Sequence, residues 1–318
     1  MTISIFIDGE AGTTGLGIRE RLADVTGVTL RSIDPARRKD PEARQTLMRE
    51  VDLVILCLPD DAARESVALA DALGSAAPRI LDASTAHRVA PGWEYGFPEL
   101  TAGQAERIAS AARVANPGCY PTGAVALLRP LVEAGLLPAD HPITINAVSG
   151  YSGGGKSMIE AYEAGRAPAF ELYGLALAHK HLPELTRYAG LTRPPIFVPS
   201  VGAFRQGMIV SVPLHLDALP GRPSPRDVEE ALRRHYRGAE LVSVEPAGEG
   251  KLEPEALNDT DRLELRVHAG APEGPARAQV VLTARLDNLG KGASGAAVQN
   301  VATMFGLRSA GAAAARAA

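Results

Sequence analysis

The first third of the chain alternates short apolar runs with polar or helix-forming stretches. The run at residues 51–58 is nearly all aliphatic, and the run at residues 3–7 stops at a glycine-rich turn. Continuous aliphatic runs of this length are typical of strands buried on both faces, as in a parallel sheet covered by helices. The pattern predicts strands at residues 3–7, 28–33, 51–58 and 79–83, and helices at residues 16–22 and 62–73. This order is typical of an α/β fold with a Rossmann-like doubly wound parallel sheet.

The pattern changes after residue 116. The later apolar runs are longer and alternate with polar residues, which favours a mixed, largely antiparallel sheet. Ser224 and Pro225 supply an N-cap and a first-turn proline for a helix that ends near Tyr236. The other elements predicted here are strands at residues 143–148, 197–201, 208–215, 262–267 and 278–286, and helices at residues 122–134 and from 292 to about 305.

These two patterns divide the chain into two domains. Its 318 residues are ample for two domains of ordinary size. We expect residues 1–116 and 291–318 to form a dinucleotide-binding domain. We expect residues 117–290 to form a second α/β domain. The alanine-rich tail at residues 310–318 is expected to fray.

Charge and composition argue against several classes of protein. The net charge is -4, from 33 Lys and Arg against 37 Asp and Glu, whereas a dedicated nucleic-acid binder normally shows a basic excess. No apolar run approaches the ~20 residues that span a bilayer, and the N-terminus lacks the basic region of a signal peptide. Two distant cysteines do not make a disulfide framework. We therefore expect a cytoplasmic enzyme with no nucleic-acid or membrane partner.

The first glycine-rich turn is a candidate dinucleotide site. Gly9, Gly12 and Gly15 follow the first strand, and Thr13 and Thr14 lie where a helix begins. Backbone N–H groups and the helix dipole at such a place can hold a pyrophosphate. The alternative is an ordinary tight turn between a strand and a helix.

The end of the second predicted strand bears on which cofactor binds. Asp34 is a residue that would contact a ribose 2′-hydroxyl and favour NAD. Arg37 and Arg38 follow closely and could instead hold the 2′-phosphate of NADP. A solvated basic turn fits the same residues, so the spacing leaves NAD and NADP open.

A second glycine motif predicts a different class of protein. Residues 150–157 read Gly-Tyr-Ser-Gly-Gly-Gly-Lys-Ser and match the P-loop pattern of ATP- and GTP-hydrolysing proteins. Against this, a complete strand–helix–strand unit precedes the loop, and the strand leading into it alternates with polar residues. No later apolar strand ends in the Asp that Mg²⁺ requires. We interpret the match as a false positive, although Lys156 and the loop amides could still form an anion nest.

The two cysteines have different surroundings. Cys57 lies inside an aliphatic run and is interpreted as a small buried hydrophobic residue. Cys119 lies at the mouth of a predicted helix, where the helix N-terminus favours the thiolate. A small residue at a turn is the alternative for Cys119, but a nucleophile fits better.

Residues 179–184 form the most distinctive polar cluster that contains histidine. His179, His181 and Glu184 could suggest zinc, but on a strand the two imidazoles would face opposite sides of the sheet. No other Cys or His completes a ligand set. We therefore predict no metal, one catalytic imidazole and one structural histidine.

Four segments together resemble a known family. Residues 116–123, Asn-Pro-Gly-Cys-Tyr-Pro-Thr-Gly, resemble the active-site signature of N-acetyl-γ-glutamyl-phosphate reductases. These enzymes act in arginine biosynthesis and are relatives of aspartate-semialdehyde dehydrogenase. The glycine loop at residues 9–15, the cluster at residues 179–184 and the late segment at residues 287–300 agree in order. The resemblance therefore covers nearly the whole chain.

The resemblance implies a covalent mechanism. Cys119 would attack the acyl phosphate and form a thioester, which NADPH bound at the Gly12 loop would reduce to the semialdehyde. His179 matches the first histidine of the family's cluster and would act as the acid/base, with His181 as the fallback. Glu184 would orient the substrate or a histidine.

The resemblance also implies binding residues. Arg88 matches a position near the acyl phosphate, and Lys156, after Ser149 and Gly150, is a second candidate for phosphate. The late turn with Asn288, Gly292 and Ala293 would line the nicotinamide side of the cofactor. Relatives often read Asn-Arg-Gly where this chain has an extra residue after Arg205, which leaves the role of Arg205 open.

Two further properties follow from the resemblance. A reductase of the one-carbon-longer aminoadipyl phosphate in lysine biosynthesis is the nearest alternative, because one methylene changes binding by only ~1–3 kcal/mol. Enzymes of this kind commonly form homodimers or homotetramers through the second domain.

Overall fold

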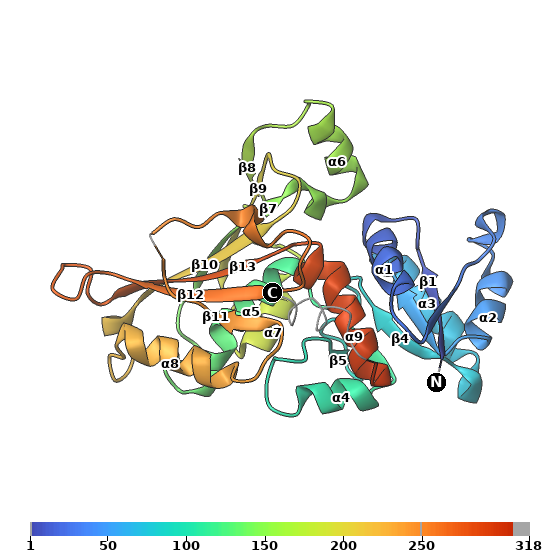
Figure 1. Cartoon of the computed structure of the whole chain (residues 1–318), viewed down its shortest axis with the longest axis horizontal. Coiled ribbons are helices and arrows are strands. Elements are labelled where there is room, and N and C mark those ends of the chain that lie inside the picture. Colours follow the sequence, from blue (N-terminus) through green and yellow to red (C-terminus); the bar gives the residue numbers. More distant parts are fainter. Residues whose placement is uncertain (1, 249, 308–318) are drawn as a thin grey trace. The chain divides into compact units, whose positions relative to one another are not determined.

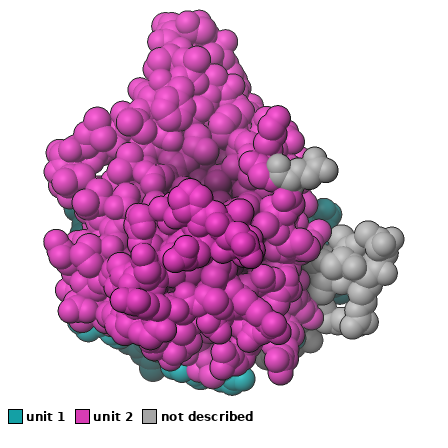
Figure 2. Space-filling model, turned by 90° about the vertical axis from the view of Figure 1, so that its left-hand side faces the viewer, with its two compact units in different colours: residues 1–98, 103–117, 293–318 teal, residues 99–102, 118–292 magenta. Residues whose placement is uncertain are grey.

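The computed structural model describes residues 2–248 and 250–307. The chain divides into two compact units, which Figure 2 colours separately. Unit 1 comprises residues 1–98, 103–117 and 293–318, and unit 2 comprises residues 99–102 and 118–292. The short segment Glu99–Ala102, expected in the first domain, thus belongs to unit 2. The expectation of a frayed tail at residues 310–318 concerns residues outside the described ranges.

Unit 1 is built around a parallel sheet (Figure 1). Its strands are β1 (Ile3–Asp8), β2 (Val28–Arg31), β3 (Leu53–Leu56), β4 (Arg79–Asp82), β5 (Glu94–Tyr95) and β6 (Arg113–Ala115). They lie in the order β2-β1-β3-β4-β6-β5, and every pairing is parallel. Its helices are α1 (Thr13–Ala23), α2 (Pro41–Arg49), α3 (Asp60–Asp71), α4 (Gln104–Ser110) and α9 (Gly295–Phe305), with short 3-10 turns η1 (Pro35–Arg37) and η2 (Gly74–Ala76). The predicted doubly wound fold is confirmed.

Alternate residues of β1 explain why both faces of this sheet are covered. Ile5 packs in one core cluster with residues of α1 and α9, whereas the next residue, Phe6, packs in another with residues of α2 and α3. Successive side chains of a strand point to opposite faces. The central residues of the strand, Ile5, Phe6 and Ile7, are therefore all apolar, and its carboxyl end carries the polar Asp8.

Unit 2 is built around a mixed sheet of seven strands. They are β7 (Thr144–Gly150), β8 (Phe170–Leu172), β9 (Ile196–Gly202), β10 (Met208–His215), β11 (Val242–Val244), β12 (Leu263–Ala269) and β13 (Gln279–Leu286), in the order β11-β12-β13-β10-β7-β9-β8. The pairs β7–β9 and β11–β12 are parallel and the other pairs are antiparallel. The prediction of a mixed, largely antiparallel sheet is confirmed.

The helices of unit 2 are α5 (Cys119–Glu133), α6 (Lys156–Glu163), α7 (Leu182–Ala189) and α8 (Pro225–His235), with short turns η3 (Tyr151–Gly154), η4 (Leu216–Ala218), η5 (Pro254–Leu257) and the π-type turn η6 (Gly290–Ser294). Helix α5 packs closely on the sheet, since a Cβ on Gly123 would lie 2.8 Å from Val210. The predicted cap of α8 is present: the hydroxyl of Ser224 accepts from the N–H of Asp227, whose carboxylate accepts in return from the N–H of Ser224.

Two helices, α5 and α2, differ from the sequence prediction. Helix α5 begins at Cys119, three residues before the predicted start, because Pro121 is compatible with a first helical turn. Helix α2 was not predicted, although Asp40 caps it and Pro41 opens it. Within residues 2–248 and 250–307, no helix is long and apolar enough to cross a membrane.

Candidate active site

Cys119 is the first residue of α5 and is half-buried. Gly118 precedes the helix in an extended conformation, and no side chain caps the helix end. The first-turn amides and the helix dipole therefore act on the thiol, which favours the thiolate. Gly292 lies directly beside it, since a Cβ on Gly292 would be 3.0 Å from the Cβ of Cys119. A glycine at position 292 thus leaves room for the nucleophile.

Glu184 holds the residue that precedes the nucleophile. The N–H of Gly118 donates to Oε1 of Glu184 at 2.8 Å, and the Glu184 side chain is only 2% exposed. Glu184 lies in the first turn of α7, so this contact ties α7 to the start of α5. We expected Glu184 to orient a histidine or the substrate; the structure gives it this backbone contact.

His179 and His181 lie in the turn before α7. The prediction that they lie on a strand and face opposite sides is wrong, because in a turn the two-residue alternation does not apply. Their ring centres are 4.8 Å apart, and both rings lie near Tyr120, at 6.3 and 6.1 Å. Among the described residues, no group of three or more His, Cys, Asp or Glu could hold a metal ion.

The protonation state of His179 follows from its contacts. The N–H of His181 donates to Nδ1 of His179 at 3.1 Å, so Nδ1 accepts and the neutral ring carries its proton on Nε2. Burial, and then the charge of Lys180, lower the pKa of His179 to about 4. At neutral pH His179 is therefore an uncharged imidazole that can donate from Nε2.

Two tyrosines that the sequence reasoning missed support this histidine. The hydroxyl of Tyr173 donates to that of Tyr120 at 3.2 Å, and Tyr120 donates to the carbonyl of Ser200 at 3.0 Å. The ring of His179 packs against Tyr173 and Phe197, with centres 5.7 and 5.1 Å away. Burial raises the pKa of Tyr173 to about 12 and that of Tyr120 further, so both phenols stay protonated. Only the position of Tyr120 next to Cys119 could have indicated this pair.

Three amides of the loop that matches the P-loop pattern donate hydrogen bonds within the protein. The N–H groups of Gly150, Tyr151 and Ser152 donate to the carbonyls of Gly207, Phe204 and Arg205. These three donors are therefore already used inside the protein.

The lysine of this loop is exposed and lies near a glutamate. The Lys156 side chain is 86% exposed and lies 3.8 Å from Glu160, while Arg205 pairs with Glu163. Ser149 is different: it is 2% exposed, and its hydroxyl donates to the carbonyl of Gly150 at 3.0 Å. Ser149 also acts on the Tyr120 hydroxyl, whose pKa it lowers slightly against the larger effect of burial.

Asn288 has a structural contact rather than an open side chain. It is 2% exposed; its Oδ1 accepts from the N–H of Gly207, and its Nδ2 donates to the hydroxyl of Ser152. The side chain thus ties two loops together.

A buried ion pair fixes the turn beside Cys119. Nζ of Lys291 lies 2.8 and 2.9 Å from the two carboxylate oxygens of Glu99, and the Lys291 side chain is 1% exposed. Lys291 immediately precedes Gly292, which touches the nucleophile. Sequence reasoning could not find this pair because 192 residues separate its members.

In unit 1, the first glycine loop joins β1 to α1 in a tight turn. Gly9 has φ +92°, and a Cβ there would collide with the backbone of Cys57; one on Gly15 would lie 2.5 Å from the carbonyl oxygen of Gly9. These two glycines let β1, the loop and α1 pack closely. Gly12 is exposed at the N-cap of α1, and no side chain forms a capping hydrogen bond there. The first amides of the helix, beginning with that of Thr13, are therefore in a position to bind an anion.

The end of β2 carries the residues that bear on cofactor choice. The carboxylate of Asp34 accepts from the N–H of Ala36 at 2.9 Å, and Arg37 pairs with Asp40 at 2.6 Å. This ion pair raises the pKa of Arg37, and Arg38 is exposed. A surface pocket of about 240 Å³ is lined by Ser32, Ile33, Asp34, Arg37, Ala43, Thr46, Leu47 and Glu50.

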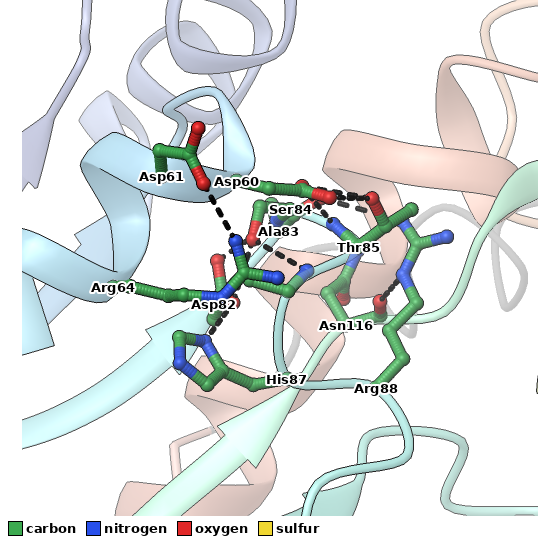
Figure 3. A network of polar contacts seen from close by, with 11 residues as sticks. Asp60, Asp61, Arg64, Asp82, Ala83, Ser84, Thr85, His87, Arg88 and Asn116 are labelled. Atoms are coloured by element: carbon green, nitrogen blue, oxygen red, sulfur yellow. Dashed lines mark hydrogen bonds and ion pairs between the residues drawn. The ribbon is translucent and has the colours of Figure 1, made fainter. Parts of the chain in front are cut away.

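Figure 3 shows the polar network after β4. Asp82 is fully buried and accepts from Ser84 and from Nδ1 of His87, the latter at 2.6 Å. The guanidinium of Arg88, which is 8% exposed, donates to the carbonyl of Asn116 at 3.0 Å. Arg88 therefore links the carboxyl ends of β4 and β6. Asp82 was missed, although it is the last residue of β4.

Comparisons with known proteins define the class. The family described as semialdehyde dehydrogenase, dimerisation domain, matches residues 119–288. The crystal structure of aspartate semialdehyde dehydrogenase with NADP from Candida albicans superimposes with a TM-score of 0.65 and 15% identity, covering 96% of this chain and 99% of that one. The family match covers more than half of the chain and defines the class: an oxidoreductase of the semialdehyde dehydrogenase kind.

Closer relatives give the particular family. N-acetyl-gamma-glutamyl-phosphate reductase 2 of Pseudomonas putida is 53% identical over 95% of this chain and 96% of its own length. N-acetyl-gamma-glutamyl-phosphate reductase of a Chelativorans species is 55% identical over 97% of this chain and 100% of its own length. The chain belongs to the N-acetyl-γ-glutamyl-phosphate reductase family, and the resemblance drawn from its motifs is confirmed.

Proposed function

We propose that this enzyme reduces N-acetyl-γ-glutamyl phosphate to N-acetylglutamate semialdehyde and phosphate with NADPH, as a step of arginine biosynthesis. The observation that carries the proposal is the placement of Cys119 at the uncapped start of α5, in one unit with the neutral imidazole of His179. The names of relatives with more than half of their residues identical support the substrate.

Cys119 acts as the nucleophile. Its thiolate forms a bond to the acyl carbon, and the bond from that carbon to the phosphate oxygen breaks, so phosphate leaves with the electron pair. The product of this step is a thioester on Cys119. When bound, the nicotinamide supplies the hydride that reduces this thioester to the aldehyde. The thiolate is then released unchanged.

His179 stabilises the oxygen of the reacting carbonyl. Its Nε2 proton is held in place because Nδ1 accepts from the N–H of His181. We assign the acid/base role to His179 rather than His181, since His181 is only 6% exposed. Proton transfer or hydrogen bonding of this kind contributes about 10²–10⁴-fold in rate.

Unit 1 binds NADP(H). Gly9, Gly12 and Gly15 shape the loop, and the amides of Thr13 and Thr14 hold the pyrophosphate. The carboxylate of Asp34 accepts one N–H, from Ala36, so the choice of NADP rests on the two arginines that follow it.

The remaining cofactor contacts are assigned by position. Arg37 and Arg38, which follow Asp34, hold the 2′-phosphate, and Gly292 and Ala293 approach the nicotinamide. A related dehydrogenase, the one from Candida albicans, is described in complex with NADP, which supports this choice.

Residues of both units bind the substrate in this proposal. Arg88 binds the acyl phosphate, and Ser149, beside Tyr120, contacts the substrate with Gly150 and His181. Glu184 contributes through Gly118 rather than directly. Lys156 is not assigned to the substrate, because its side chain is exposed and pairs with Glu160.

We also propose a homodimer or homotetramer, which the description of the matched family as a dimerisation domain supports.

The proposal is tested by phosphate-dependent reduction of NADP⁺ with N-acetylglutamate semialdehyde. Cys119→Ser should lose turnover and keep NADP⁺ binding, whereas Cys57→Ala should keep both, because burial raises the pKa of the Cys57 thiol to about 12 and leaves it inert. Retained turnover in Cys119→Ser would refute the covalent mechanism. Faster turnover of the aminoadipyl analogue would assign the enzyme to lysine biosynthesis instead.

A further inference from the structure

Arg88, which we place on the acyl phosphate, lies in a loop without regular structure. Residues 83–93 connect β4 to β5, and this fully described stretch contains no helix or strand. A loop of this kind lacks the repeating backbone hydrogen bonds of a helix or sheet, so its course depends on the contacts of its side chains. Those contacts therefore decide where the guanidinium of Arg88 lies.

The carboxylate of Asp82 organises the first half of this loop. Asp82 is the last residue of β4 and is fully buried. One of its oxygens accepts from the N–H of Ser84 at 2.8 Å. The other accepts from the hydroxyl of Ser84 at 2.8 Å and from Nδ1 of His87 at 2.6 Å. Since a carboxylate can only accept, Nδ1 of His87 carries the proton, and hydrogen bonds to an ionised acceptor are the stronger ones.

His87 also reaches the other end of the loop. Its ring stacks on that of Trp93, with the ring centres 4.2 Å apart and an angle of 13° between the planes. The His87 side chain is 11% exposed, so water competes little for these contacts. His87 thus ties Asp82, the residue before the loop, to Trp93, the residue at its end.

Arg88 follows His87 directly, and Figure 3 shows the two side chains leaving the loop in different directions. The guanidinium of Arg88 donates from Nε to the carbonyl of Asn116 at 3.0 Å and from Nη2 to that of Ala83 at 3.3 Å. Both carbonyls belong to residues that directly follow a strand, β6 and β4. A shift of the backbone at His87 would therefore move the base of the Arg88 side chain relative to these two carbonyls.

We propose that His87 is a positioning residue: through Asp82 and Trp93 it fixes the loop so that Arg88 meets the phosphate group of the substrate. The inference rests on the proposed function, because it concerns the phosphate ligand named there. His87 does not touch the substrate in this proposal, so its loss should weaken phosphate binding and leave the chemical step almost unchanged.

Two replacements of His87 separate its hydrogen bond from its ring. His87→Asn keeps an N–H donor at the place of Nδ1 and removes the ring, whereas His87→Phe keeps a ring against Trp93 and removes the donor. Arg88→Met removes the proposed phosphate ligand, and a double variant combines His87→Phe with Arg88→Met. His141→Phe is the matched control, since His141 is a partly buried histidine of unit 2 outside this loop.

Phosphate-dependent reduction of NADP⁺ gives kcat and the KM for phosphate and for the semialdehyde, and circular dichroism reports folding. His87→Phe should raise the KM for phosphate roughly tenfold, with kcat and the KM for the semialdehyde within about twofold of wild type. His87→Asn and His141→Phe should have the wild-type KM for phosphate. The double variant should have the same KM for phosphate as Arg88→Met alone, because His87 acts through Arg88.

The proposal is overturned if His87→Asn is no better than His87→Phe, which would make the ring and its packing the important part. It is also overturned if the two changes multiply in the double variant, since His87 would then act independently of Arg88. If His87→Phe does not fold, Asp82→Asn replaces it, because it removes the charge that Nδ1 faces and should raise the KM for phosphate in the same way.

Failure of the proposed function gives different results. An active wild type whose Arg88→Met variant keeps the KM for phosphate would refute the assignment of Arg88, and the role of His87 with it. A wild type without phosphate-dependent turnover would refute the proposed reaction as a whole.

Discussion

Replacing Lys291 by methionine removes the positive charge from the buried ion pair next to the nucleophile. Nζ of Lys291 lies 2.8 and 2.9 Å from the two oxygens of Glu99, and the Lys291 side chain is 1% exposed. Unit charges at this separation attract by ~6 kcal/mol at an effective dielectric constant of 20, and desolvation offsets much of that attraction. The expected loss is therefore the cost of leaving the Glu99 carboxylate buried without its lysine, about 3–5 kcal/mol in the free energy of unfolding.

A loss of this size is a large share of the ~5–15 kcal/mol that stabilises a typical domain. The double variant Glu99→Gln, Lys291→Met removes both charges and should recover part of the loss. Activity should fall as well, because Gly292 follows Lys291 and touches Cys119. A displacement of ~1 Å at a reacting group can cost about 10²-fold in rate.

Urea unfolding followed by circular dichroism measures the stability, and the semialdehyde assay measures kcat under conditions where every variant is folded. Arg226→Met is the control, because Arg226 forms an exposed pair with Glu230 on α8 and such pairs contribute at most ~1 kcal/mol. The reasoning is refuted if Lys291→Met is no less stable than Arg226→Met. It is also refuted if the double variant is no more stable than Lys291→Met alone.

Three further predictions concern the site. As pH falls, kcat/KM should decrease with an apparent pKa near 4, because burial lowers the pKa of His179 to about 4. A decrease with an apparent pKa near 6.5 that is absent in His179→Asn would contradict this. The same pKa shift means that the unfolded chain binds more protons at this histidine than the folded chain between about pH 4 and 6.5. The contribution of His179 to the free energy of unfolding should therefore decrease as pH falls through that window. Urea unfolding at several pH values measures this. Gly292→Ala should lower kcat by roughly 10²-fold with little change in NADP⁺ binding, since the new Cβ would lie 3.0 Å from that of Cys119, and an unchanged kcat would show that this approach is unimportant.

The parallel sheet of unit 1 was predictable because its central strands are buried on both faces and so carry apolar residues at successive positions. Strands β5 and β6 were not predicted, since they have only two and three residues and show no periodicity. In unit 2 the alternating pattern indicated strands but not their direction. The parallel pairing of β7 with β9 depends on the chain between them, which forms β8 and α7.

The site was predictable where local sequence carries the chemistry. Cys119 was found from its place before a helix, and the glycine loop from its place after a strand. The supporting contacts could not be found this way, because they join residues far apart: Gly118 with Glu184 are separated by 66 positions and Tyr120 with Tyr173 by 53. The error over His179 and His181 came from assuming a strand where Pro183 opens a helix.

The central claim is that Cys119 forms a thioester with the acyl group. The most direct test mixes the enzyme with N-acetyl-γ-glutamyl phosphate in the absence of any nicotinamide, and measures released phosphate and the intact mass of the protein. The account predicts a rapid release of about one phosphate per active chain, with the acyl group on the peptide that contains Cys119, and neither result in Cys119→Ser. Turnover by the complete system without any acyl group on Cys119, or an acyl group on another residue, would contradict it.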